Sequence, residues 1–232
     1  MAGGGRDEIG RNVRLVLERI GQAAQRAGRD PASVRLVAAT KTVPPESVRE
    51  AIDAGVRIVG ENRVQEALAK MSALGADGRV AWHFIGQLQR RKARSVVGAF
   101  QLIHSVDSVA LAEELDRRAR EAGVRQAILL EVNVGGEASK AGFAPETLPE
   151  AVQAVERLEH VAIGGLMTVP PPTIDPEGAR PYFRRMREWL EACARPGMTE
   201  LSMGMSHDFD VAIEEGATLV RVGTAIFGAR RG

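Results

Sequence analysis

Apolar positions along this chain follow two kinds of spacing. Over 7–27 they recur every three to four residues with Arg and Glu between them, and Gly28 follows, which predicts an amphipathic helix. Short apolar runs typical of buried strands then recur at 36–40, 56–60, 82–85, 102–105, 127–134, 161–167, 201–205 and 219–222. Helical patterns separate these runs, at 45–54, 63–74, 87–98, 108–122, 145–158, 177–194 and 208–215.

Alternating strands and helices predict a parallel sheet, and eight strands suit a closed barrel. We therefore expect an α/β protein with a single (β/α)₈ TIM barrel over 35–229, in which the extra N-terminal helix 7–27 precedes the first strand. The whole chain, 1–232, is expected to form one domain. A doubly wound sheet is the competing fold, but its nucleotide-binding form has a glycine-rich turn where this chain has KTVPP.

Composition and charge narrow the classes of function. The 31 basic and 30 acidic residues leave a net charge of +1, so we expect no nucleic-acid or membrane partner. The single cysteine, Cys193, excludes an internal disulfide. We see no secretory signal and no apolar stretch of membrane-spanning length, and we expect a cytoplasmic protein without a metal site.

A lysine directly follows the first predicted strand. The run RLVAATKT leads from apolar residues to Lys41, and only four of the 31 basic residues in the chain are lysine. A buried lysine is costly unless it is paired, neutralised or used covalently. Because the active sites of such barrels lie at the carboxyl ends of the strands, Lys41 is a candidate for condensing with an aldehyde to form a Schiff base.

The last predicted strand supplies further candidates. Its alternation places Leu219, Arg221 and Gly223 on one face, so Arg221 points either into the barrel or outward to an ion pair among the helices. Gly223 and Thr224 follow this strand, and Ser206 follows the strand before it. Backbone amides and hydroxyls at these two loops are typical of barrel phosphate sites.

A strand-end lysine, a phosphate site and an arginine together meet the needs of pyridoxal phosphate, whose ring nitrogen is held by Asp or Arg. A guanidinium accepts no hydrogen bond, so Arg221 would keep that nitrogen unprotonated and weaken the cofactor as an electron sink. The expected site therefore binds the cofactor while discouraging most carbanion chemistry.

Several motifs of the chain carry a family resemblance: VAATKT, GENRVQE, WHFIGQLQ, EVNVGGEASKAG, GLMTVPPP, LSMGMSHD and VRVGTAIFGAR. From about residue 36 to 229 the sequence resembles the pyridoxal phosphate homeostasis proteins, whose fold type III barrel is similar to the cofactor-binding domain of bacterial alanine racemase. The resemblance implies a covalent aldimine between pyridoxal 5'-phosphate and Lys41, with Arg221 facing the ring nitrogen. It assigns the phosphate to Ser206, Gly223 and Thr224.

The resemblance also implies that Asn62 lies beside the cofactor and that His83 is a pocket residue. A histidine satisfied by backbone groups is the alternative for His83. Lys140 matches a position where the family commonly has lysine, which raises the hypothesis of a secondary acceptor during cofactor transfer. The alternative for Lys140 is a solvated surface lysine.

Three functions are compatible with these residues. The first is a protein that holds pyridoxal 5'-phosphate and delivers it to apo forms of cofactor-dependent enzymes, without robust catalysis of its own. The second is a racemase-like enzyme, but the tyrosine base of racemases comes from a further domain, and Tyr182 suits packing. The third is a Schiff-base aldolase, for which Glu61 is the evident carboxylate at the mouth. Absence of the racemase dimer domain favours a monomer.

Overall fold

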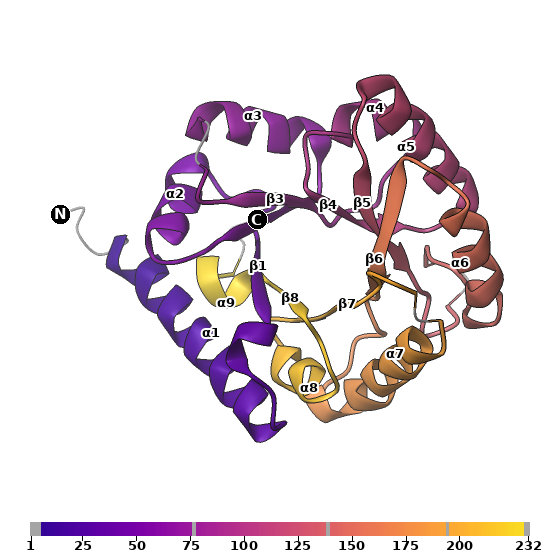
Figure 1. Ribbon diagram of the computed structural model, residues 1–232. Coiled ribbons are helices and arrows are strands. Elements are labelled where there is room, and N and C mark those ends of the chain that lie inside the picture. Colours follow the sequence, from indigo (N-terminus) through magenta and orange to yellow (C-terminus); the bar gives the residue numbers. More distant parts are fainter. Residues whose placement is uncertain (1–5, 76–77, 138–139, 194, 230–232) are drawn as a thin grey trace.

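The computed structural model describes residues 6–75, 78–137, 140–193 and 195–229 (Figure 1). Eight parallel strands pair in chain order and β8 pairs with β1, so the sheet closes into a barrel. This arrangement confirms the predicted α/β barrel. The strands are β1 (Arg35–Ala39), β2 (Ile58–Glu61), β3 (Ala81–Phe84), β4 (Leu102–Val106), β5 (Gln126–Glu131), β6 (Val161–Met167), β7 (Glu200–Met205) and β8 (Leu219–Val222).

Helices surround the barrel, as the view along its axis shows (Figure 1). The α-helices are α1 (Arg6–Arg26), α2 (Pro45–Asp53), α3 (Val64–Leu74), α4 (Ala93–Val96), α5 (Val109–Ala122), α6 (Leu148–Glu156), α7 (Arg180–Cys193), α8 (Phe209–Glu214) and α9 (Thr224–Phe227). Short 3₁₀ turns lie at η1 (Pro31–Ser33), η2 (Arg90–Lys92), η3 (Pro145–Thr147) and η4 (Pro176–Ala179).

Two predicted elements differ most from the sequence pattern, because each is much shorter in the structure. The pattern at 87–98 yields only η2 and α4, because the chain leaves the helix after Val96 and turns at Gly98, whose φ is 74°. The strand predicted to reach 134 ends at Glu131. Val132 and Val134 are buried in the following loop, so their apolar character extends the pattern beyond the sheet.

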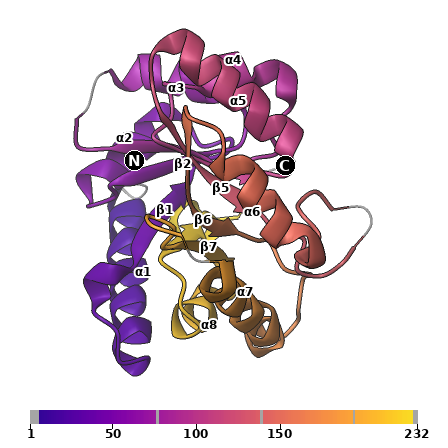
Figure 2. The same ribbon diagram turned by 45° about the vertical axis from the view of Figure 1, so that its right-hand side comes forward.

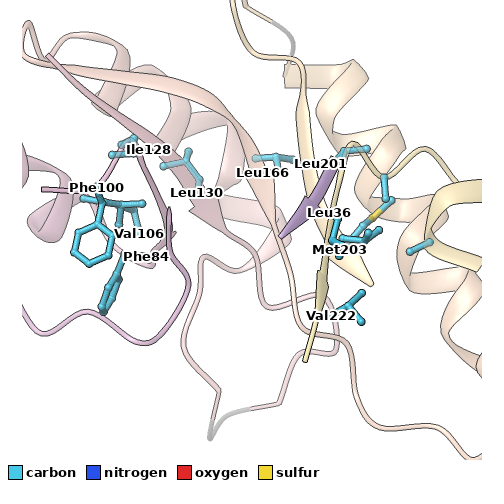
Figure 3. Close-up of a cluster of buried hydrophobic side chains, with 14 of the residues drawn as sticks. Leu36, Phe84, Phe100, Val106, Ile128, Leu130, Leu166, Leu201, Met203 and Val222 are labelled. Carbon is cyan, nitrogen blue, oxygen red and sulfur yellow. The ribbon is translucent and has the colours of Figure 1, made fainter. Parts of the chain in front are cut away.

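Buried apolar residues form two layers. One fills the barrel interior and contains Val37, Ile58, Leu102, Leu129, Met167 and Leu219. The other lies between strands and helices, and Figure 3 shows part of it, including Leu36, Phe84, Leu201 and Val222. Successive strand residues alternate between these layers. In β8, Leu219 faces inward and Val220 outward, which sends Arg221 into the barrel.

The N-terminal helix α1 packs outside the barrel against α2, α8 and α9 (Figures 1 and 2). Its apolar stripe includes Val13, Val16 and Ile20, all buried. The Asn12 Nδ2 donates a hydrogen bond of 3.0 Å to the Ile226 carbonyl in α9. This helix therefore joins the start of the barrel to its last element. None of the helices in the described ranges combines the length and apolar character needed to span a membrane.

Candidate functional site

A cavity of about 940 Å³ opens at the carboxyl ends of β1, β2 and β8. Residues of α1 and α9 complete its wall, among them Asn12 and Ile226. Its lining includes five of the residues proposed from sequence: Lys41, Asn62, Arg221, Gly223 and Thr224. The structure therefore gathers the candidate amine, the candidate arginine and the Gly-Thr turn around one space.

Lys41 lies two residues after the end of β1 and is half-buried on the cavity wall. Ala39, two residues earlier, lines the same cavity, whereas Thr40 between them is fully buried on the other side of the strand. The Thr40 Oγ1 donates a hydrogen bond of 2.5 Å to Glu61 Oε1. Strand alternation thus separates the cavity side, with Lys41, from a polar cluster behind it.

That cluster joins β2 to α3. Lys70 is only 4% exposed, and its Nζ lies 2.7 Å from Glu61 Oε1 and 2.8 Å from Glu66 Oε1. Burial raises the pKa of Glu61, although hydrogen bonds from Lys70 and Thr40 oppose the rise. Burial also acts to raise the pKa of Glu66, but hydrogen bonds from Lys70 and a backbone amide outweigh it, so this pKa lies below the usual value.

The position of Glu61 corrects one expectation from sequence. A mouth carboxylate was expected there, but Glu61 is fully buried and paired with Lys70 behind the strand. The physical reason is the period of the strand: Ile58 faces the barrel interior, so Glu61, three residues later, faces the helices. Glu61 therefore cannot serve the aldolase alternative as a carboxylate in the cavity.

Arg221 is fixed by two neutral acceptors inside the barrel. Its Nη1 donates to Ser202 Oγ at 2.7 Å, and its Nη2 donates to the Thr168 carbonyl at 2.8 Å. Burial lowers the pKa of the guanidinium to about 10, while the charges of Glu131 and Asp208 act to raise it. Arg221 therefore remains a cation at neutral pH, and neither of its hydrogen-bond acceptors carries a charge.

A chain of hydrogen bonds continues from Arg221 across the barrel interior. The Ser202 Oγ lies 2.8 Å from His104 Nδ1, and His104 Nε2 lies 2.9 Å from His83 Nδ1. Burial, with the charge of Arg35, lowers the pKa of His83 to about 3. Burial and the nearby charges of His83 and Arg221 likewise hold the pKa of His104 well below its usual value. Both rings are neutral near pH 7.

His83 thus occupies a different place from the other candidates. It is buried in the barrel interior and does not line the cavity. Hydrogen bonds through His104 and Ser202 connect it to Arg221, which does line the cavity. Its observed partner is another side chain, whereas the alternative from sequence was a backbone group.

Ser206 brings the loops after β7 and β8 together. Its Oγ accepts hydrogen bonds from the backbone amides of Gly223, at 3.2 Å, and Ala225, at 3.3 Å. The Asp208 Oδ1 in turn accepts one from the Met205 amide at 2.7 Å, which holds the loop that carries Ser206. Hydroxyl and amide groups are therefore concentrated at the β8 edge of the cavity.

Two other residues considered from sequence lie away from the cavity wall. The Lys140 Nζ lies 2.5 Å from Glu137 Oε2 and 3.4 Å from the Pro170 carbonyl. Tyr182 is partly buried in α7 and packs against the outer apolar layer.

Sequence reasoning missed the groups that support Lys41 and Arg221. His104 and Ser202 lie at inward positions of predicted strands, so strand alternation could have found them. Glu131 lies at an inward position too. Burial and the negative charge of Asp107 raise the pKa of this carboxyl to about 7, although Arg221 opposes the rise. Glu66 and Lys70 are four residues apart in a predicted helix, a spacing that could have indicated their ion pair. No comparable signal marks the contacts of Lys70 with Glu61 and Thr40, because these residues come from other elements.

A closed parallel barrel with a lysine after its first strand and an inward arginine on its last strand is the arrangement expected of barrels like the alanine racemase N-terminal domain. Comparison with known proteins supports the same class. The family model for the alanine racemase N-terminal domain matches residues 13–231. The pyridoxal phosphate homeostasis protein of Aquifex aeolicus (strain VF5) is 50% identical over 219 residues, which are 93% of this chain and 96% of that relative.

Two solved structures are also similar. An unknown protein from Bifidobacterium adolescentis superposes with a TM-score of 0.91 at 40% identity, covering 98% of this chain and 97% of that one. PipY of Synechococcus elongatus PCC7942, with PLP bound, has a TM-score of 0.79 at 40% identity, covering 92% of this chain and 100% of that one. The chain belongs to the pyridoxal phosphate homeostasis protein family, whose barrel is that of the alanine racemase N-terminal domain.

Proposed function

We propose that this protein binds pyridoxal 5'-phosphate in the cavity and holds it through a Schiff base on Lys41 for delivery to other proteins. The observation that carries the proposal is the placement of Lys41, Arg221 and the Gly223–Thr224 turn on one cavity wall. The PLP-bound structure of a relative at 40% identity supports the same ligand.

The chemistry of the lining residues fits this cofactor. The bound cofactor supplies an aldehyde, with which a lysine amine condenses; one water leaves and a carbon–nitrogen double bond forms. Lys41 is the lysine on the cavity wall, and Asn62 lies on the same wall. Ser206 and Thr224 offer hydroxyl donors for the phosphate, and the Gly223 amide, which donates to Ser206 Oγ in this structure, could turn to the phosphate in its place.

Arg221 suits the ring nitrogen because it can only donate hydrogen bonds. Its Nη1 and Nη2 are already engaged within the barrel, so its position is set before any ligand enters. His83 has an indirect part in this proposal, as the far end of the hydrogen-bond chain that holds Arg221.

We further propose that the protein acts as a carrier in the cytoplasm, as a monomer, and is not itself an effective enzyme. Two-base racemization needs a second proton donor opposite the lysine. Tyr182 is the only tyrosine of the chain, and it packs on α7 away from the cavity wall. The recipients would be apo forms of enzymes that use pyridoxal 5'-phosphate.

The test is an absorbance spectrum of the purified protein with added pyridoxal 5'-phosphate, followed by borohydride reduction and peptide mapping. We expect a Schiff-base band that reduction fixes on the Lys41 peptide and that Lys41→Ala abolishes. Lys92→Ala, which removes a lysine outside the cavity wall, is the matched control and should keep the band.

Activity assays complete the test. Absence of racemase and decarboxylase turnover across the amino acids would support a carrier. Turnover of any amino acid by the loaded protein would replace the carrier with an enzyme. Absence of the band in the wild-type protein would refute the role of Lys41.

A further inference from the structure

Lys70 is a second lysine close to Lys41 in the fold, and it has a different environment. It lies on α3, where all three protons of its ammonium have acceptors: Glu61 Oε1, Glu66 Oε1 and the Thr40 carbonyl. It does not line the cavity. Because Lys70 is buried and fully engaged, it is not available to react with a ligand, and its contacts need another explanation.

Those contacts hold the residue on each side of Lys41. On one side, Lys70 Nζ donates to the carbonyl of Thr40, and the Thr40 Oγ1 donates to Glu61 at 2.5 Å. On the other side, the Thr42 amide donates to Glu66 Oε1 at 2.6 Å. Lys70 bonds both carboxylates, so one ammonium fixes the backbone before and after Lys41.

The backbone at Thr42 is in a conformation that needs such support. Its φ is 65°, in the left-handed region, and it is the one non-glycine residue with positive φ in the described ranges. A β-branched side chain is strained in this conformation, which persists only where the surroundings impose it. The bond from the Thr42 amide to Glu66 is a contact that can impose it.

Lys70 also affects the charge around Lys41. Glu61 and Glu66 both pair with Lys70, and within the described residues no carboxylate lies within ion-pair distance of Lys41. Without the Lys70 ammonium, the two carboxylates would attract the nearest remaining lysine. An amine held as an ammonium by a carboxylate is a poor nucleophile.

We propose that Lys70 is a positioning residue, which through Glu61 and Glu66 fixes residues 40 and 42 and keeps Lys41 free of carboxylate partners for attachment of an aldehyde ligand. This inference rests on the proposed function, because it assigns Lys70 a role in the reaction of Lys41. It assigns no contact between Lys70 and the ligand.

The experiment compares Lys70→Met and Glu66→Gln with wild-type protein. Pyridoxal 5'-phosphate is added to each apo protein, and the rate of attachment to Lys41 is followed by absorbance across a pH series. Binding of pyridoxine 5'-phosphate, which has an alcohol in place of the aldehyde, is measured by calorimetry. Glu215→Gln is the matched control. It neutralises a buried carboxylate that pairs with Arg180 and Arg184, away from Lys41.

We expect Lys70→Met to slow attachment at least about tenfold and to move its rate profile toward higher pH, because freed carboxylates stabilise the Lys41 ammonium. Affinity for the alcohol should change less than about threefold, since the cavity wall is intact. Glu66→Gln neutralises a partly exposed carboxylate and keeps Lys70. It should slow attachment about threefold, and it provides the test if Lys70→Met does not fold. Glu215→Gln should leave the rate unchanged.

Wild-type rates and pH profiles in both variants would overturn the inference, as would equal slowing by Glu215→Gln. Equal losses of attachment and of alcohol binding would overturn it too, because they indicate a damaged cavity. A wild-type protein that forms no bond at Lys41 would instead refute the proposed function, so the two failures are distinguishable.

Discussion

Lys41 and Arg221 lie on one cavity wall, but their surroundings are opposite in character. Behind Lys41 is a charged cluster in which Lys70 pairs with two carboxylates. Behind Arg221 are a serine hydroxyl, a backbone carbonyl and two neutral histidines. The first arrangement engages both carboxylates with Lys70, and among the described residues it leaves the Lys41 amine without a carboxylate partner. The second fixes a guanidinium without cancelling its charge, so that charge acts on the cavity.

The largest expected effect comes from Glu131, an inward-facing carboxyl group that interacts electrostatically with Arg221. Glu131 has a pKa of about 7 in the fold against 4.5 for a free glutamate. Between pH 4.5 and 7 Glu131 is protonated in the folded state and ionised in the unfolded state. Its contribution to stability is therefore fully present below about pH 4.5 and is lost as the pH rises through 7. Up to about pH 7 this carboxyl therefore remains largely neutral and leaves the charge of Arg221 in place.

Glu131→Gln should raise the free energy of unfolding by up to about 3 kcal/mol at pH 8.5 and change it little at pH 4.5. Urea denaturation at both pH values measures the difference. Glu114→Gln is the control with the opposite sign, because hydrogen bonds from Arg117 lower the pKa of Glu114 to about 2. An equal effect of Glu131→Gln at both pH values would show that its carboxyl does not titrate as described.

A smaller effect is expected when the neutral hydrogen-bond acceptor of Arg221, the Ser202 hydroxyl, is removed. Ser202→Ala leaves a buried guanidinium donor without its acceptor, which should lower the free energy of unfolding by about 2 kcal/mol. Affinity for pyridoxal 5'-phosphate should fall about tenfold as the guanidinium loses its fixed position. Denaturation and calorimetry measure the two effects.

The matched control for Ser202 is Ser105→Ala. Ser105 is also a buried serine, but its Oγ donates to the Gly86 carbonyl and has no bond to Arg221. It should lose stability and keep the wild-type affinity. If both serine variants weaken binding equally, the neutral acceptor is not what positions Arg221.

The smallest effect on binding is expected at Lys140. Its ammonium pairs with Glu137 outside the cavity wall, so Lys140→Ala should change the affinity for pyridoxal 5'-phosphate less than about twofold. The rate of delivery to an apo enzyme, measured by its regained activity, tests the transfer hypothesis separately. A slower rate with intact binding supports a role in transfer, and an unchanged rate rules it out.

The barrel and much of its cavity could be predicted from the sequence because both follow from local periodicity. Alternation in β8 limits Arg221 to two directions, and the end of β1 brings Lys41 to the mouth. The order of strands follows from their number and their helical connections.

What could not be predicted depends on packing between distant elements. The role of Lys70 needs α3 to lie over the ends of β1 and β2, and the role of His104 needs β4 to face β7 across the barrel. The early end of β5 was also missed, because the buried loop residues Val132 and Val134 continue the apolar pattern of the strand.

The contact between α1 and α9 has a consequence for synthesis of the chain. The side chain of Asn12 binds the carbonyl of Ile226, and both residues line the cavity. Because residue 226 is made more than two hundred residues after residue 12, α1 has to wait for α9 before this part of the wall is complete. A nascent chain lacks Arg221 until β8 has been made, so the proposed cofactor site forms only after β1 to β8 are all available to close the barrel.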